Sequence, residues 1–345
     1  MIGIYNAKSG KSSEFLIKYA KILDYNRIAY KFIDYDNRFF DEIKECSFYI
    51  HRFVGTDDEI YIARTLLPLV ENHLGIKCFP DFNTYWPYED KIKEFLLSEI
   101  YNLPMAKSFI FFDFRKSKEW INSNEKYPLI FKLKSGAGSI NVVKVNSKID
   151  AIKLAKKMFT SGIKSEGIPS FGNLKYFNPY NLMKYYGIKL LSALNLYTSW
   201  NTWNKHKMYV LFQEFLPHND YDTRITIIGD RAYAYRRFNR KNDFRSSGSG
   251  LIDYSIESID LDFIKTAFHV SKLLGFQSMA YDFLKDQSGN PVFCEFSYTF
   301  KDQILYDSPG YWDSSLNFIE GHFWPQYFQL IDLLEISNLK QPNDL

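Results

Sequence analysis

Two acidic residues near the end of the chain are spaced for joint chemistry. The segment 279–298 (MAYDFLKDQSGNPVFCEFSY) predicts a hairpin whose turn is centred on Ser288-Gly289. That turn places Asp282 directly opposite Glu295, where cross-strand neighbours lie roughly 5 Å apart. Two carboxylates this close repel each other unless a cation lies between them, and Mg²⁺ prefers carboxylate oxygens with phosphates and water. The pair predicts a magnesium site; two hairpin acids facing water or an arginine are the alternative.

A second set of candidates is the small-residue segment SGAGS at 135–139. The residues before it, PLIFKLK, read as a strand on which Lys132 and Lys134 share one face. A loop of small residues folds closely over phosphates and donates backbone N–H groups, while a lysine supplies a point charge. The loop predicts a phosphate site made by Ser135, Gly136, Ala137, Gly138 and Ser139, although similar turns are common without a ligand.

A third candidate is the end of the strand KMYVLFQEFL, at Gln213, Glu214, Phe215 and Leu216. A strand edge with a free backbone offers the donor and acceptor that an adenine ring requires. Glu214 or Asp222 can then hold the ribose hydroxyls.

The fourth candidate is an arginine-rich stretch, YRRFNRKNDFRSSGSG. It contains Arg236, Arg237, Arg240 and Arg245 among small residues. Guanidinium groups here can hold phosphates or the oxyanion of a tetrahedral centre. A solvated basic loop is the alternative.

The elements that must position these residues fall into several regions. Residues 1–85 alternate short strands with helices, which predicts a parallel sheet and a Rossmann-like domain. Residues 86–160 form a lobe with the glycine-rich loop, 161–206 have weak periodicity and are interpreted as an insertion, and strands dominate 207–335. NAKSGKSS near the start misses the phosphate-binding P-loop pattern because Tyr5 stands where glycine is needed, so a polar helix-capping loop is expected there.

The composition excludes several classes of protein. Lys and Arg number 43 against 40 Asp and Glu, so the basic excess of a dedicated nucleic-acid surface is missing. The three cysteines, Cys46, Cys78 and Cys294, are far apart and indicate neither a disulfide framework nor a CxxC metal site. No apolar run is long enough for a signal peptide or a membrane span. We expect a cytoplasmic protein that binds no nucleic acid and no membrane; homo-oligomer formation stays open.

Taken in order, these pieces resemble the ATP-grasp superfamily over roughly residues 86–335, and most of all its ribosomal-protein glutamate ligase group. The matching segments are Gln213-Glu214-Phe215, Asp222-Thr223-Arg224, Phe244-Arg245-Ser246-Ser247, and Asp282 followed by Glu295-Phe296-Ser297. Two departures stand out. Ser297 replaces the asparagine that usually completes the metal site, and Ser247 replaces another asparagine in the arginine loop.

The resemblance implies a fold of the α/β and α+β classes, with a Rossmann-like pre-ATP-grasp domain followed by a two-lobed ATP-grasp fold. It implies that ATP and Mg²⁺, or Mn²⁺, are bound and that a carboxylate is joined to an amine through an acyl phosphate. The small-molecule or peptide-like substrates stay open. A kinase on the same fold, or a nucleotide-binding protein without turnover (suggested by Ser297), are the alternatives.

The resemblance also assigns roles to residues. Lys91 and Lys132 would hold phosphates beside the glycine-rich loop, and Gln213 to Leu216 with Asp222 would hold the nucleoside. Asp282, Glu295 and Ser297 would hold the metal, and Arg245 and Arg236 would steady the reacting charge. The aromatic tail with Tyr311, Trp312, His322 and Trp324 is either an acceptor pocket or lid, or a hydrophobic seam between lobes.

Overall fold

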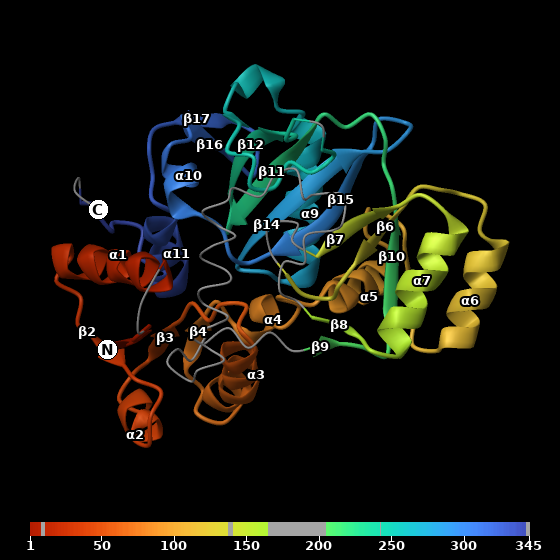
Figure 1. The fold of residues 1–345 in the computed structure, drawn as a ribbon. Coiled ribbons are helices and arrows are strands. Elements are labelled where there is room, and N and C mark those ends of the chain that lie inside the picture. The colour runs from red at the N-terminus through yellow and green to blue at the C-terminus, as the bar shows by residue number, and fades with distance from the viewer. Residues whose placement is uncertain (8–10, 137–140, 165–204, 242, 343–345) are drawn as a thin grey trace, which may run out of the picture. The chain divides into compact units, whose positions relative to one another are not determined.

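The structure is a computed structural model that describes residues 1–7, 11–136, 141–164, 205–241 and 243–342 (Figure 1). The chain divides into two compact units. Unit 1 comprises residues 1–54, 59–106 and 216–345, and unit 2 comprises residues 55–58 and 107–215. Within the described ranges, no helix has the length and apolar character that a membrane crossing requires.

Unit 1 begins with a four-stranded parallel sheet, in the order β2-β1-β3-β4. Its strands are β1 (Ile2–Tyr5), β2 (Tyr30–Ile33), β3 (Phe48–Ile50) and β4 (Lys77–Phe79). The helices between them are α1 (Lys11–Tyr25), α2 (Phe39–Ile43) and α3 (Asp57–Asn72). β1, β3 and β4 are short and mostly buried because helices cover the sheet, whereas in the edge strand β2 only Ile33 is buried. The parallel sheet predicted for residues 1–85 is confirmed.

A larger antiparallel sheet completes unit 1, in the order β15-β14-β11-β12-β16-β17 with β13 beside β12. Its strands are β11 (Tyr221–Ile228), β12 (Arg231–Phe238), β13 (Ile252–Asp253), β14 (Ser278–Lys285), β15 (Pro291–Ser297), β16 (Gly310–Asp313) and β17 (Phe318–Glu320). Helix α9 (Leu261–Leu274) packs on β11 and β14, where the Phe263 ring stacks on Phe283 at 5.3 Å between centroids. Both predicted hairpins, β11–β12 and β14–β15, are present.

Shorter helices complete the core of unit 1. They are α4 (Phe82–Tyr85), α5 (Lys91–Tyr101), η2 (Ile256–Ser258), α10 (Asp302–Tyr306) and α11 (Pro325–Leu334). The aromatic tail packs inside this unit: Trp312 and Trp324 are buried, and Trp324 stacks on Tyr306 with the Lys18 ammonium 3.4 Å from its ring centroid. These aromatic residues therefore hold α10, α11 and α1 together.

Unit 2 is built on an antiparallel sheet in the order β5-β10-β6-β7. Its strands are β5 (Ser108–Phe111), β6 (Leu129–Lys132), β7 (Val142–Val145) and β10 (Val210–Glu214). Helices α6 (Phe114–Ser123) and α7 (Lys148–Phe159) lie side by side (Figure 1), and Trp120 of α6 packs on Phe109 at 4.4 Å. A small ribbon, β8 (Ile163–Lys164) with β9 (Lys205–His206), brackets the predicted insertion, of which residues 165–204 lie outside the described residues.

The divisions between the units differ from the domain boundaries expected at 85/86 and 206/207. They fall at 106/107 and 215/216. The first lies later than expected because residues 86–106 pack on the late hairpin. The Ala106 N–H donates to the Phe293 carbonyl at 2.9 Å, and the Phe293 N–H donates to the Pro104 carbonyl at 2.9 Å. Helix α5 thus belongs with β15, which is what places Lys91 near the predicted acidic pair.

Candidate active site

Asp282 and Glu295 are direct cross-strand partners on β14 and β15, as predicted. The turn differs in detail: Lys285 pairs with Pro291, which centres the turn on Ser288 alone. A regular ladder would then bring Asp282 opposite Cys294. The register shifts between Asp282 and Phe283, so that Cys294 is the extra residue of a β-bulge. The bulge restores the pairing that the predicted turn implied.

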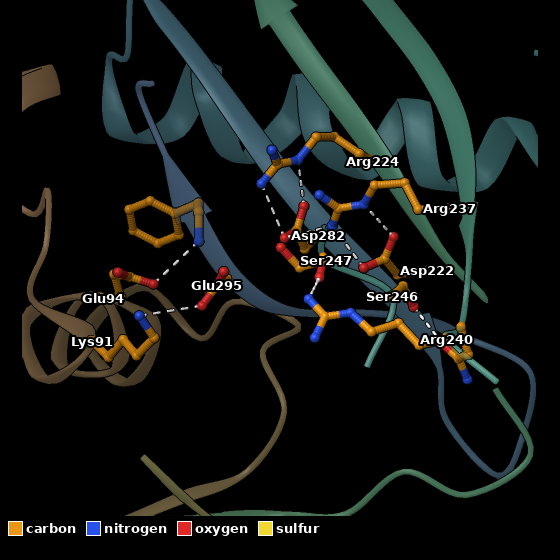
Figure 2. A network of polar contacts seen from close by, with 12 residues as sticks. Lys91, Glu94, Asp222, Arg224, Arg237, Arg240, Ser246, Ser247, Asp282 and Glu295 are labelled. Atoms are coloured by element: carbon orange, nitrogen blue, oxygen red, sulfur yellow. Dashed lines mark hydrogen bonds and ion pairs between the residues drawn. The ribbon is translucent and has the colours of Figure 1, made fainter. Parts of the chain in front are cut away.

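Asp282 also has arginine partners on neighbouring strands (Figure 2). Arg224 lies directly opposite it on β11 and donates from Nε to Oδ1 at 2.6 Å and from Nη2 to Oδ2 at 3.0 Å. Arg237 of β12 reaches the same Oδ2 at 2.8 Å and donates two further bonds to Asp222, at 2.7 and 2.6 Å. We call Asp222, Arg224, Arg237 and Asp282 the Arg–Asp cluster.

Strand geometry explains why these four side chains meet. Asp222 and Arg224 are two residues apart on β11 and therefore share a face. Their direct neighbours across the sheet are Arg237 and Asp282, and opposite charges directly across a ladder attract. The two-residue turn at 229–230 sets the first of these pairings, so counting outward from this turn identifies Arg237 as the partner of Asp222.

Burial makes the Arg–Asp cluster electrostatically strong. Asp282 is 5% exposed; burial alone would raise its pKa, but Arg224 and Arg237 outweigh it and lower the pKa. Burial and the charge of Asp282 raise the pKa of Asp222, which Arg237 only partly offsets. Two carboxylates and two guanidinium groups balance in charge, and a buried set of this kind is costly to break.

Helix α5 supplies a second ionic pair to the same hairpin (Figure 2). The Lys91 ammonium lies 3.3 Å from Glu295 Oε2 and is buried; burial would lower its pKa, but Glu295, Glu94 and Glu89 together raise it. One turn along the helix, Glu94 accepts the Phe296 N–H at 3.1 Å. These two contacts fix the helix against β15 and hold a cation beside the acidic pair.

The donor set fits a magnesium ion only in company with other ligands. Asp282 and Glu295 are the carboxylates that Mg²⁺ prefers, and Ser297 follows two residues later with its Oγ 3.0 Å from Thr299 Oγ1. Over the parts of the chain that the structure describes, no three His, Cys, Asp or Glu side chains are grouped to hold a metal. Because both Asp282 oxygens also accept from arginines, an ion here needs phosphate oxygens and water to complete its shell.

The two arginines predicted to be catalytic lie elsewhere in unit 1. Arg236 sits opposite Asp253 on β13 and donates from Nε to it at 2.9 Å. Arg245 pairs with Asp243, Nε to Oδ1 at 2.9 Å, inside the loop that follows β12. It is Arg237, the neighbour of Arg236 on the other face of the strand, that joins the Arg–Asp cluster. Because successive side chains along a strand point to opposite faces, Arg236 and Arg237 lie on different faces of β12.

The loop that carries Arg245 is held closed by its own side chains (Figure 2). Arg240 donates to the Ser247 carbonyl, and the Ser246 hydroxyl donates to the Asn239 side chain. Ser247 thus contributes a backbone carbonyl that anchors Arg240.

In unit 2, the predicted phosphate residues lie at the end of β6. Lys132 is the last residue of the strand and is buried, whereas Lys134 follows after the strand has ended. Gly136 has φ +120°, and a Cβ there would lie 2.3 Å from Asn141 Nδ2, so the loop requires glycine at this position. Ala137, Gly138 and Ser139 lie outside the described residues.

The predicted nucleoside residues are divided between the units. Gln213 is buried and donates to the Ser108 hydroxyl at 3.0 Å, and Glu214 accepts the Lys107 N–H at 2.9 Å. The Lys144 ammonium lies 3.9 Å from the Phe215 ring centroid. Leu216 begins the next part of unit 1. Asp222, the other predicted ribose ligand, has both oxygens on Arg237.

Comparison with known proteins identifies the fold. No family model and no curated protein matches the sequence. A RimK domain ATP-grasp protein from Sphaerobacter thermophilus matches with a TM-score of 0.50 and 10% identity, over 88% of this chain and 93% of that chain. The D-alanine–D-alanine ligase of Bacillus anthracis complexed with ATP matches with a TM-score of 0.52 and 11% identity, over 86% and 85%.

A third match is N5-carboxyaminoimidazole synthase from Aspergillus clavatus in complex with ADP and 5-aminoimidazole ribonucleotide. Its TM-score is 0.54 at 10% identity, and the match covers 97% of this chain and 77% of that chain. The mixed α/β architecture and its several sheets agree with these structures. This chain therefore has the ATP-grasp fold.

Proposed function

We propose that this chain is an ATP- and Mg²⁺-dependent ligase that joins a carboxylate to an amine through an acyl phosphate. The observation that carries the proposal is the pairing of Asp282 with Glu295, on an ATP-grasp fold, within reach of the buried cations Arg224, Arg237 and Lys91. Acids and cations packed this closely suit a reaction in which negative phosphate charge shifts between oxygens.

The proposed role of each group of residues follows from its chemistry. Lys132, Ser135 and the glycine-rich loop would bind phosphates, and the strand end at 213–216 would bind adenine. Asp282, Glu295 and Ser297 would hold Mg²⁺, or Mn²⁺, which neutralises phosphate oxygens when bound. Lys91 supports Glu295, as the 3.3 Å ion pair suggests.

The reaction has two balanced steps. An oxygen of the substrate carboxylate forms a bond to the γ-phosphorus while the bond to the β-γ bridging oxygen breaks, and ADP leaves. The amine nitrogen then bonds to the acyl carbon, inorganic phosphate departs, and the amine loses a proton. In this proposal Arg224 and Arg237 would stabilise the charge of the acyl phosphate, and we prefer them to Arg236, whose partner is Asp253. Arg245 remains a candidate through its loop.

The N-terminal parallel sheet fits the Rossmann-like domain that precedes the ATP-grasp fold, and we assign residues 1–85 to that role. The insertion at 161–206 and the lobes 86–160 and 207–335 would then carry the substrate and nucleotide contacts. Small-molecule or peptide-like carboxylates and amines are the proposed substrates, in the cytoplasm.

Hydroxylamine tests the proposal directly. Incubation with ATP, Mg²⁺, a panel of carboxylic acids and hydroxylamine should give a hydroxamate together with one ADP per product. Phosphoryl transfer to an alcohol would instead give a hydroxylamine-resistant phosphoester, which is the kinase outcome. ATP binding without ADP release from any acid would leave a nucleotide-binding protein, as the serine at 297 suggested.

A further inference from the structure

A buried hydrogen-bond chain in unit 2 ends on the first serine of the glycine-rich loop. The Ser135 hydroxyl lies 3.2 Å from His206 Nε2, and His206 Nδ1 lies 3.0 Å from the Tyr209 hydroxyl. The Tyr209 oxygen in turn accepts the Lys134 N–H at 2.8 Å. All three side chains are less than a tenth exposed. The chain links the ribbon strand β9 to the loop after β6.

The direction of donation along this chain decides how the serine hydroxyl is used. A tyrosine oxygen that accepts the Lys134 N–H keeps its own proton and a second lone pair, so Tyr209 can either donate to His206 Nδ1 or accept from it. In the arrangement where Tyr209 donates, the imidazole accepts at Nδ1. A neutral imidazole that accepts at Nδ1 carries its proton at Nε2 and donates it to Ser135 Oγ. The serine proton must then be donated in another direction, away from the histidine.

The backbone around Ser135 is held in the same place by a separate contact. Asn141 Nδ2 donates to the Ser135 carbonyl at 3.0 Å, and the Leu133 N–H donates to the Asn141 carbonyl at 3.2 Å. The carbonyl and the hydroxyl of Ser135 are thus both restrained, on opposite sides of the residue. Restraint of this kind orders a donor before a ligand binds and reduces the entropy lost on binding.

We propose that His206 is a positioning residue that orients the Ser135 hydroxyl as a hydrogen-bond donor to a phosphate oxygen of the nucleotide. The proposal rests on the proposed function, since it requires a nucleotide at this loop. In this assignment Tyr209 donates to His206 Nδ1 and thereby sets the tautomer of His206. His206 therefore acts on the nucleotide through the Ser135 hydroxyl.

A double-mutant cycle tests this assignment. Ser135→Ala and His206→Phe should each weaken ATP binding about tenfold, the loss expected for one hydrogen bond to a charged acceptor. The double variant should bind no more weakly than either single variant, because both remove the same bond. His206→Gln, which keeps an N–H donor near the position of Nε2, should recover affinity to within about threefold of the wild type. Titration calorimetry of the full chain with ATP measures the dissociation constants of the wild type and the four variants.

Adenosine is the control ligand, and His269→Phe is the control variant. Adenosine lacks phosphates, so its affinity should be equal in the wild type and all variants; a general loss of structure would weaken it as well. His269→Phe, at an exposed position on α9, should leave ATP affinity unchanged. If His206→Phe does not fold, Tyr209→Phe replaces it in the same cycle with Ser135→Ala.

The possible failures can be told apart. A wild-type chain that binds no ATP overturns the proposed function and, with it, this inference. A wild-type chain that binds ATP while the losses from Ser135→Ala and His206→Phe add up, or while His206→Phe binds normally, overturns the role of His206 alone.

Discussion

Replacing Asp282 by asparagine should destabilise unit 1 strongly, even without nucleotide or metal. The amide keeps the shape of the side chain but removes the charge that Arg224 and Arg237 share. Asp222 then remains as the cluster's only carboxylate against two buried guanidinium groups. The loss therefore comes from uncompensated charge and not from altered packing.

The magnitude follows from burial. Breaking one partner of a buried ion pair costs about 3–5 kcal/mol. For a cooperative unit of about 230 residues, each 1 kcal/mol lowers Tm by about 2–4 °C, so Asp282→Asn should melt about 6–20 °C below the wild type. The Glu295 side chain is 28% exposed and its Oε2 lies 3.3 Å from the Lys91 ammonium, which also has Glu94 nearby. Glu295→Gln should cost only about 1 kcal/mol.

Thermal unfolding followed by circular dichroism, in a chelating buffer without nucleotide, measures both variants. The chelator matters because a bound ion would stabilise the wild type through the same carboxylates. An Asp282→Asn variant that melts within 2 °C of the wild type would show that the arginines do not depend on this acid. Equal losses in the two variants would refute the distinction between a buried cluster and a half-buried pair.

Two further predictions concern charge in unit 1. Burial lowers the pKa of His51 to about 3 despite its contact with the Pro80 carbonyl. The His51 side chain therefore stays neutral in the folded chain at pH values below about 6.5, at which it binds a proton in the unfolded chain. This stability is complete above that pH and is lost as the pH falls: urea unfolding should show a loss of about 2 kcal/mol between pH 7.5 and 5 that His51→Gln removes. Arg237→Met should cost about 3–5 kcal/mol and Arg236→Met, whose partner Asp253 is partly exposed, less than about 1 kcal/mol; similar melting temperatures would contradict the placement of Arg237 in the cluster.

The sequence predicts those parts of the site that follow from counting residues along strands and turns. The parallel sheet and both hairpins follow from strand spacing and approximate turn position. The pairing of Asp282 with Glu295 was also predicted, but it depends on the bulge at Cys294, because the observed turn alone would bring Asp282 opposite Cys294. The arginine partners of Asp282 were named only as one general alternative, because they come from strands that meet it through the order β14-β11-β12. Strand order in a sheet depends on long-range packing, which periodicity does not encode.

The choice between Arg236 and Arg237 shows the same limit at a smaller scale. Both are adjacent basic residues in one strand, and composition cannot distinguish their faces. The ladder does so, since Arg237 is opposite Asp222 while Arg236 is opposite Thr223 and Asp253. The division into units differs from the expected domain boundaries for a related reason: α5 reads as the start of a new region, but its Glu94 contact to β15 joins it to the later hairpin.

The extra residue at Cys294 also decides what the hairpin tolerates in length. Phe293 and Phe296 are an odd number of residues apart, yet both are buried against Tyr281, at 5.8 and 5.9 Å between ring centroids. Only an offset in the pleat lets them face the same side. Loop insertions at 287–289 should leave the acids in register. Deletion of residue 294 should do so as well, because a regular ladder continued from Phe283 and Phe293 then brings Glu295 opposite Asp282. An unbulged ladder that kept Cys294 would instead bring Glu295 opposite Tyr281, on the face of the phenylalanines.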